Sequence, residues 1–301
     1  MKAFLKEVEK KEIGKIVRDV FLSKYTAYKV GGIATVIIYP KNQEKLVALC
    51  KLIRKYHLKY KILGFGSNLL FSDKRYKDVL IKLDEFNKIE FVGNKVICGA
   101  GASLMKVSKE AAKRSLTGLE FAAGIPGSIG GAIYMNAGAY KSDMGYIVQS
   151  VTVLTDDLRI ITLTNQEMDF HYRSSLLQRE KGFICLEAVL KLVKGDRKEI
   201  ENVLRERKER RLASQPLEYP SAGSVFRNPE GMFAGKMIED IGLKGLTKGG
   251  AQVSEKHANF IINKNEASAK DIHDLILFVQ EAVEEHYHIK LKVEQEFVNW
   301  E

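Results

Sequence analysis

The sequence has few cysteines and no long apolar run. Three cysteines occur among 301 residues, and none forms a Cys-x-x-Cys pair. This spacing argues against a disulfide framework and a thiolate zinc site, so Cys50, Cys98 and Cys185 are expected to be core thiols. No apolar stretch approaches the ~18 residues of a membrane helix, and the opening MKAFLKEVEKKEIG is too charged for a signal peptide. We therefore expect a cytoplasmic protein without a membrane segment.

Metal-binding signatures are also missing. The histidines form no His-Glu-x-x-His motif, and no Asp/Glu cluster has ligand spacing, so no metal is expected. The apolar content of 45% excludes fibrous, collagen-like and disordered classes. At roughly 100–200 residues per domain, the length predicts about two domains.

The charge is basic: 48 Lys+Arg against 38 Asp+Glu gives +10. Such a charge permits an anionic partner, but the basic residues are spread along the chain, which favours phosphates over nucleic acid. The segment DRKEIENVLRERKERR (196–211) could form a basic nucleic-acid face, but its interleaved glutamates favour a solvated helix. We expect no nucleic-acid partner.

Periodicity divides the chain into three stretches and predicts an α+β protein. Residues 1–83 carry a surface helix over 4–20, a helix capped by Asn42 and a strand at 60–63, which form one βαβ unit. Residues 84–205 carry a helix near 104–116 and alternating apolar strands typical of antiparallel sheet. Residues 206–301 end in a helix over 268–286 and a strand over 289–298.

The most informative segment is GLEFAAGIPGSIGGAIYMNAGAY (118–140), in which six of the 21 positions from Gly118 to Gly138 are glycine. Glycine loses much backbone entropy on folding, so this density indicates a backbone that must approach a ligand with its N–H groups available. A diphosphate fits that requirement, and Ile125, Ile129 and Ile133 would suit a flat aromatic ring. The alternative is a set of tight turns at sheet edges.

A second glycine turn, GFGSNLL, follows the strand at 60–63. Leu69 occupies the place of the third glycine in a Rossmann fingerprint, and Leu104 does so after Gly99-x-Gly101. The two glycine segments therefore indicate a dinucleotide held between subdomains without a helix N-terminus at its pyrophosphate. That arrangement is more typical of a flavin than of a nicotinamide.

Three polar groups are candidates for chemistry. Arg173 lies among aromatic residues in DFHYRSS, where its planar fork could bind a carboxylate or form a structural ion pair. Ser224 in YPSAGSVFRNP has no neighbouring histidine, which argues against a hydrolase triad. Glu294 and Glu296 would share one face of the final strand, either as a catalytic pair or as exposed acids.

Seven motifs together resemble the UDP-N-acetylenolpyruvoylglucosamine reductase (MurB) family, and the resemblance runs from about Tyr25 to Phe297. They are GFGSNLL, GLEFAAGIPGSIGGAIYMNAGAY, DFHYRSS, PSAGSVFRNP, AGKMIEDIGLKG, GGAQVSEKHANFIIN and IKLKVE. The resemblance implies an FAD-binding fold of the vanillyl-alcohol-oxidase (PCMH-type) class in two subdomains, 1–83 and 84–205. It also implies a C-terminal α+β substrate domain, 206–301.

The resemblance also implies a reaction. FAD and NADPH would serve to reduce UDP-N-acetylglucosamine enolpyruvate to UDP-N-acetylmuramate in peptidoglycan synthesis, by hydride transfer from reduced FAD to C3 and protonation at C2. Arg173 would hold the carboxylate, Ser224 would donate the proton and Glu294 would orient or hydrogen-bond near that centre. Asn228, Lys236 and His257 would contact substrate. The implied cofactor-binding residues are Gly64, Phe65, Gly66, Ser67, Asn68, Leu69, Pro126, Gly127, Ser128, Gly130, Gly131, Asn136, Ala137 and Gly138.

Three departures from the family pattern are visible. Phe65 stands where the family commonly has glycine, and Gln295 replaces an apolar neighbour of the glutamate. The 51-residue interval from Arg173 to Ser224 resembles the subtype without a tyrosine-bearing loop over the substrate. Two rival hypotheses are another flavin oxidase or dehydrogenase of the same fold and a non-enzymatic anion-binding protein. The first should lack PSAGSVFRNP and KHANFIIN, and the second leaves the glycine segments unexplained.

Overall fold

The computed structural model describes residues 1–300 and divides the chain into two compact units. Unit 1 comprises Met1–Arg18, Val36–Gly64 and Asp78–Lys208, and unit 2 comprises Asp19–Thr35, Phe65–Lys77 and the chain from Glu209 onward. Each unit has a hydrophobic core of its own. The division into 1–83, 84–205 and 206–301 stays a prediction.

The expected βαβ segment is present. Strand β2 (Ile33–Pro40) is followed by helix α2 (Gln43–Lys55) and strand β3 (Tyr60–Ile62), in a sheet of order β1-β2-β5-β3 that also contains β1 (Gly14–Phe21) and β5 (Tyr76–Ile81). Asn42 caps α2 as predicted, because its side chain accepts a hydrogen bond from the Lys45 N–H at 2.9 Å. The apolar face of α2 is buried, including Leu46, Leu49 and Ile53.

The helix predicted over 4–20 is only half correct. Helix α1 (Lys2–Lys10) ends early, and β1 begins at Gly14. Glu12 has a left-handed backbone with φ of 49°, which breaks the helix, and a Cβ on Gly14 would lie 1.8 Å from the Tyr39 carbonyl oxygen. Pairing with β2, favoured by the β-branched Ile16 and Val17, therefore overrides the helical spacing of the apolar residues.

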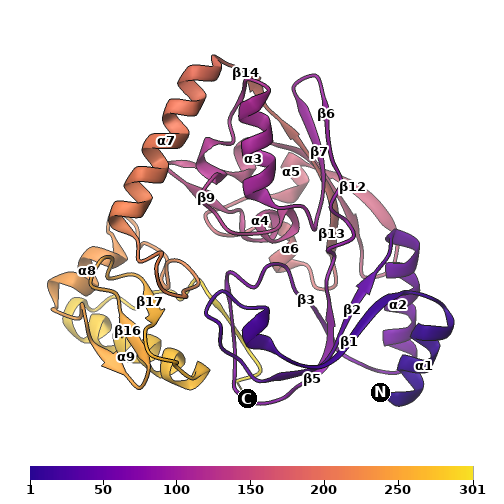
Figure 1. The fold of residues 1–301 in the computed structure, drawn as a ribbon, viewed down its shortest axis with the longest axis horizontal. Helices are drawn as coiled ribbons and strands as arrows, with labels where there is room; N and C mark the ends of the chain where they lie inside the picture. The colour runs from indigo at the N-terminus through magenta and orange to yellow at the C-terminus, as the bar shows by residue number, and fades with distance from the viewer. Residues whose placement is uncertain (301) are drawn as a thin grey trace. The chain divides into compact units, whose positions relative to one another are not determined.

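The second sheet of unit 1 is antiparallel throughout, as the alternation predicted (Figure 1). Its order is β12-β11-β13-β7-β6. The strands are β6 (Ile89–Val92), β7 (Lys95–Gly99), β11 (Val148–Leu154), β12 (Ile160–Thr164) and β13 (Ile184–Lys191). The other elements here are α3 (Leu104–Lys113), β8 (Leu116–Thr117), β9 (Gly138–Ala139), β10 (Ser142–Asp143), α5 (Asn165–Met168), α6 (Leu176–Arg179), β14 (Val193–Lys194) and two short 3₁₀ turns, Glu120–Ala122 and Met144–Tyr146. A third 3₁₀ turn, Leu22–Lys24, belongs to unit 2.

The glycine-dense segment contains a helix that the sequence argument did not anticipate. Helix α4 (Ile129–Met135) packs against β7 and β13, and Ser128 caps it by accepting from the Gly131 N–H at 3.3 Å. A Cβ on Gly130 would lie 3.1 Å from the Ala100 Cβ, so glycine permits the helix to approach the end of β7 closely. The glycine segment thus contains a helix N-terminus, and the expectation that none lies at the pyrophosphate of the dinucleotide stays a prediction.

Helix α7 (Arg197–Ser214) is long and solvated: Ile200 is its one buried residue, and Arg197 pairs with Glu201 at 2.7 Å. Unit 2 then contains α8 (Ala234–Asp240), a three-stranded sheet, and α9 (Ala269–Tyr287). The sheet is made of β15 (Thr247–Lys248), β16 (Ala251–Val253) and β17 (Ile261–Asn263). The buried face of α9 supplies much of the unit 2 core, including Leu275, Ile276 and Val279.

The last strand is shorter than predicted. Strand β18 (Glu296–Val298) pairs in parallel with β4 (Leu69–Phe71), and the chain bends at Gln295. Because Glu294 precedes this bend, the alternation that was expected to place Glu294 and Glu296 on one face does not apply.

Candidate active site

The two glycine segments approach each other at Gly64 and Ser128, which both belong to unit 1. A Cβ on Gly64 would lie 2.8 Å from the Ser128 hydroxyl oxygen, and Ser128 forms an antiparallel bridge with Ser103. The Gly127 carbonyl accepts from the Leu104 N–H at 3.0 Å, and the Gly130 N–H donates to the Ala100 carbonyl at 2.8 Å. The absence of a side chain at Gly64 thus lets two segments about 60 residues apart approach each other closely.

The rest of the first turn belongs to unit 2. Gly66 has φ of 65°, and a Cβ there would lie 2.0 Å from the Tyr25 carbonyl oxygen, so only glycine fits. The Phe65 side chain is exposed, and the Asn68 amide donates to the Glu294 carbonyl at 3.1 Å. Ser67 and Leu69 complete the turn, with Leu69 opening β4.

Asn136 is used inside the protein. It is buried with a left-handed φ of 43°, its amide donates to the His171 carbonyl at 2.8 Å, and its side-chain oxygen accepts from the Gly145 N–H at 2.9 Å. Its side chain therefore ties the end of α4 to the loop that carries Arg173.

Arg173 occupies a strained position in a tight turn. His171 and Ser174 form a bridge across the turn, and Arg173 has φ of 55°, a conformation that disfavours residues with a side chain. Its guanidinium donates to the Gly138 carbonyl at 2.8 Å and lies 5.0 Å from the centre of the Tyr172 ring. The turn therefore holds a half-buried cation against the end of the glycine segment, next to Ala137 and Gly138.

A cavity of about 310 Å³ in unit 2 brings four predicted residues together. Ser224, Asn228, Lys236 and His257 all line it, although the sequence separates them by up to 33 positions. Its other lining residues are Ser214, Phe233, Gly235, Glu239, Lys256, Ala258 and Asn259.

Ser224 lies on a short backbone ladder with the segment before β18. Phe226 bridges Val293, the Glu294 N–H donates to the Val225 carbonyl at 2.8 Å, and the Arg227 N–H donates to the Lys292 carbonyl at 2.9 Å. Glu294 is thereby fixed on the strand segment adjacent to that of Ser224. Within residues 1–300 the Ser224 hydroxyl has no hydrogen-bond partner, which leaves it available to a ligand.

The sequence did not predict the roles of Asn259 and Gln295, although Gln295 was noted as a departure from the family pattern. Asn259, buried at the cavity wall, accepts from the Phe226 N–H at 2.9 Å and donates to the Phe226 carbonyl at 2.8 Å. Gln295 is buried, accepts from the Tyr28 hydroxyl at 2.9 Å and donates to the Ala222 carbonyl at 3.3 Å. Both amides fix the backbone on either side of Ser224, and a polar amide among apolar neighbours was the signal for them.

The polar groups of the cavity have distinct charge states. Burial lowers the pKa of His257, which favours the neutral ring at pH 7, and its Nδ1 accepts from the Asn259 N–H at 3.2 Å. The ring proton then belongs on Nε2, where it can be donated. The hydrogen bond from Lys236 to Asp240 raises the pKa of Lys236, which keeps this lysine charged. Asn228 accepts from the Ala234 N–H at 3.0 Å and so anchors the start of α8.

Comparison with known proteins identifies the family. A model of the C-terminal domain of UDP-N-acetylenolpyruvoylglucosamine reductase matches residues 215–298, and a model of an FAD-binding domain matches residues 34–164. The reductase of Clostridium perfringens is 46% identical over 279 residues, which cover 93% of this chain and 91% of that protein. The reductase of Bacillus subtilis is 42% identical and covers 99% of each. The chain belongs to the UDP-N-acetylenolpyruvoylglucosamine reductase family.

Solved structures agree with this assignment. The reductase of Thermus caldophilus has 35% identity and a TM-score of 0.82, covering 94% of this chain and 99% of that one. The glucose dehydrogenase Phl p 4.0202 has 14% identity and a TM-score of 0.52 over 65% of this chain and 44% of that one, a likeness of fold alone. The predicted FAD-binding fold of the vanillyl-alcohol-oxidase (PCMH-type) class, with its C-terminal α+β domain, is confirmed.

Membership of this family makes the chain an FAD-dependent oxidoreductase. Within the described residues 1–300, no group of histidine, cysteine and acidic side chains could hold a metal ion. Over the same residues, no helix is long and apolar enough to cross a membrane.

Proposed function

We propose that this chain reduces the enolpyruvyl ether of UDP-N-acetylglucosamine to UDP-N-acetylmuramate, with NADPH as reductant, in the cytoplasm. The observation that carries the proposal is the unit 2 cavity, where Ser224, Asn228, Lys236 and His257 converge. The relatives named above carry the name of the same reductase.

The glycine segments around Gly64 and Ser128 fit FAD, because the lack of a side chain at Gly64 brings the two segments close together. When bound, FAD supplies the two-electron chemistry that carries a hydride from NADPH to C3 of the enolpyruvyl group. The protein would hold the cofactor through residues 64–69 and 126–138.

The remaining steps belong to side chains of this chain. Arg173 binds the substrate carboxylate and stabilises the negative charge that spreads into it from C2. Ser224 then donates its proton to C2, and Glu294 orients the donor or hydrogen-bonds near it. Lys236, and Lys256 beside it in the cavity wall, suit the diphosphate of the substrate, while the neutral His257 can donate from Nε2.

Replacing Ser224 separates proton donation from the redox half-reaction. We expect Ser224→Ala to bind FAD and to be bleached by NADPH at the wild-type rate under anaerobic conditions, but to turn over about 10²–10⁴-fold more slowly. Stopped-flow absorbance measures bleaching, and steady-state NADPH oxidation with the enolpyruvyl sugar nucleotide measures turnover. Ser214→Ala is the matched control in the same cavity wall. A full steady-state rate in Ser224→Ala would remove Ser224 from the mechanism.

The wild-type protein tests the function as a whole. It should be yellow, lose its colour with NADPH, and regain it when the enolpyruvyl sugar nucleotide is added without oxygen. Failure of the last step alone would indicate a different flavoenzyme of this fold.

A further inference from the structure

Lys82 is a buried lysine at the end of β5 in unit 1. It is 7% exposed, and among residues 1–300 it is the only Lys, Arg, Asp or Glu that is buried to this degree. Its backbone N–H donates to the Ile38 carbonyl at 3.0 Å, so the main chain holds it firmly in the sheet. An ammonium group removed from water costs several kcal/mol unless it is well paired, so its position calls for a partner.

The partners that the protein supplies are limited. The ammonium donates to the Gly64 carbonyl at 2.7 Å and lies 3.3 Å from a carboxylate oxygen of Asp84. The Asp84 side chain is 47% exposed, so water screens much of its charge. An ammonium has three N–H donors, and these two acceptors leave one of them for another group.

The position of the Lys82 ammonium relates it to the cofactor. Gly64, whose carbonyl it binds, opens the first glycine turn and lies against Ser128 of the second glycine segment. The ammonium therefore lies beside the point where the first glycine turn approaches the Ser128 side chain of the second segment. Neither glycine segment contributes a lysine or an arginine of its own between 64 and 69 or between 126 and 138.

We propose that Lys82 is a cofactor-binding residue whose free N–H and charge bind the diphosphate of FAD. The diphosphate is the anionic part of FAD, and a charge-assisted hydrogen bond to it would compensate the burial of the ammonium. The bond to the Gly64 carbonyl holds the turn and the ammonium in one fixed arrangement. This inference rests on FAD being the cofactor.

The test measures FAD affinity of the apoprotein, not activity. We expect Lys82→Met to weaken FAD binding by about 10- to 100-fold, the range for losing a hydrogen bond to a charged group. Riboflavin, which lacks phosphate, should bind Lys82→Met and the wild type equally. Lys88→Met is the matched control, because Lys88 is 71% exposed and also pairs with one carboxylate, that of Glu90; its FAD affinity should equal that of the wild type.

Quenching of flavin fluorescence gives both dissociation constants. Unchanged FAD affinity in Lys82→Met overturns the proposal, and so does an equal loss for FAD and riboflavin, because a collapsed turn would weaken both. If Lys82→Met does not fold, Asp84→Asn decides: removing the competing carboxylate should tighten FAD binding a few-fold, and unchanged or weaker binding overturns the proposal. Failure of the wild type itself to bind FAD would instead contradict the proposed function.

Discussion

At the scale of single residues, the site depends on amides that no catalytic argument singles out. Asn259 uses both ends of its side chain on the backbone of Phe226, two residues beyond Ser224. Gln295 binds the Tyr28 hydroxyl and the Ala222 carbonyl, two residues before Ser224. A hydroxyl that must donate a proton at one atom needs a backbone fixed on both sides, and these amides provide that support.

Replacing Asn259 should damage stability and turnover together. Asn259→Leu leaves the Phe226 N–H and carbonyl without partners, and each buried unsatisfied group costs about 1–3 kcal/mol. We expect a lower free energy of unfolding in urea titrations and a reduced kcat, because Ser224 loses its fixed position. Asn265→Leu, which makes the same substitution in the loop after β17, is the control. If Asn259→Leu kept the wild-type stability and kcat, the hydrogen bonds between Asn259 and the Phe226 backbone would have no role in either.

The three thiols should be unreactive in the native protein. Cys50, Cys98 and Cys185 are buried, as predicted, and burial raises the pKa of Cys50 to about 11 and that of Cys185 to about 12. Because the thiolate is the reactive form, a disulfide reagent at pH 8 should modify none of the three at an appreciable rate. Absorbance of the released thiol should rise to three equivalents in denaturant. A Lys88→Cys variant supplies an exposed thiol for comparison, and a native cysteine reacting as fast would contradict the prediction.

At the scale of secondary-structure elements, the sequence predicted correctly those features that depend on local signals such as capping residues and apolar alternation. Asn42 and Ser268 begin helices at the predicted places because their side chains accept hydrogen bonds from backbone N–H groups three residues on. The antiparallel sheet follows from alternation. Strand β1 was mistaken for helix because its identity depends on pairing with β2, a contact that the spacing of Ile16 and Val17 does not encode.

For the candidate site too, the sequence predicted the residues that motifs identify and not those whose role depends on tertiary packing. The serine, asparagine, lysine and histidine of the cavity were named from motifs, and the structure brings them together. Lys82 was not predicted because it lies 18 residues from Gly64, directly after β5, and the segment YKDVLIK carries no ligand motif. Its burial depends on tertiary packing, which a single sequence does not state.

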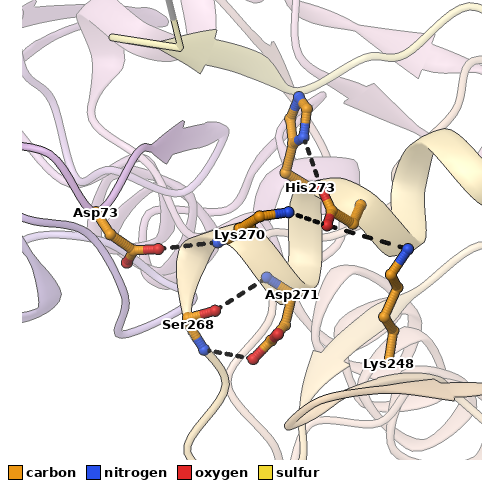
Figure 2. A network of polar contacts seen from close by, with 7 residues as sticks. Asp73, Lys248, Ser268, Lys270, Asp271 and His273 are labelled. Carbon is orange, nitrogen blue, oxygen red and sulfur yellow. Dashed lines mark hydrogen bonds and ion pairs between the residues drawn. The ribbon is translucent and has the colours of Figure 1, made fainter.

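Two sets of side-chain hydrogen bonds stabilise the N-terminus of helix α9 (Figure 2). They predict that the stability of the fold decreases in acid. Asp73 accepts from the Ala269 and Lys270 N–H groups, each at 3.0 Å, and Ser268 and Asp271 form a reciprocal capping box. Burial raises the pKa of Asp271, but hydrogen bonds from the Ser268 N–H and hydroxyl and the Gly250 N–H outweigh it, so the net shift is downward. A carboxyl with a lowered native pKa stabilises the fold above its ordinary pKa, and that stability is lost as the pH falls through the native value.

We therefore expect Asp271→Asn to be less stable than the wild type by about 0.5–2 kcal/mol at pH 7. The difference should shrink below the ordinary aspartate pKa of 3.8 and vanish once the wild-type carboxyl is protonated. Urea titrations followed by circular dichroism at pH 7, 5, 4 and 3 measure it. Glu281→Gln, on an exposed position of the same helix, is the matched control. A difference that persists unchanged at pH 3 would mean that the carboxylate charge is not its source.

At the scale of the whole molecule, the two units have separate hydrophobic cores and carry different parts of the predicted site. The core of unit 1 runs from Phe4 to Leu192 and surrounds the sheet that supports α4, whereas that of unit 2 gathers around α9. Gly64, Ser128, Lys82 and Arg173 belong to unit 1, and Ser224 and Glu294 belong to unit 2.

FAD and UDP should stabilise the apoprotein independently of catalysis. A ligand that binds only the native state raises the free energy of unfolding by about 2.7 kcal/mol at 100 times its dissociation constant and by about 1.4 kcal/mol for each further tenfold. We expect the midpoint of thermal unfolding, measured by scanning calorimetry, to rise continuously with FAD concentration and again when UDP is added. Riboflavin and uridine, which lack the diphosphate, should shift it less at equal concentration. Because the response to FAD follows mass action, a midpoint that is indifferent to FAD concentration would mean that the native fold does not bind FAD.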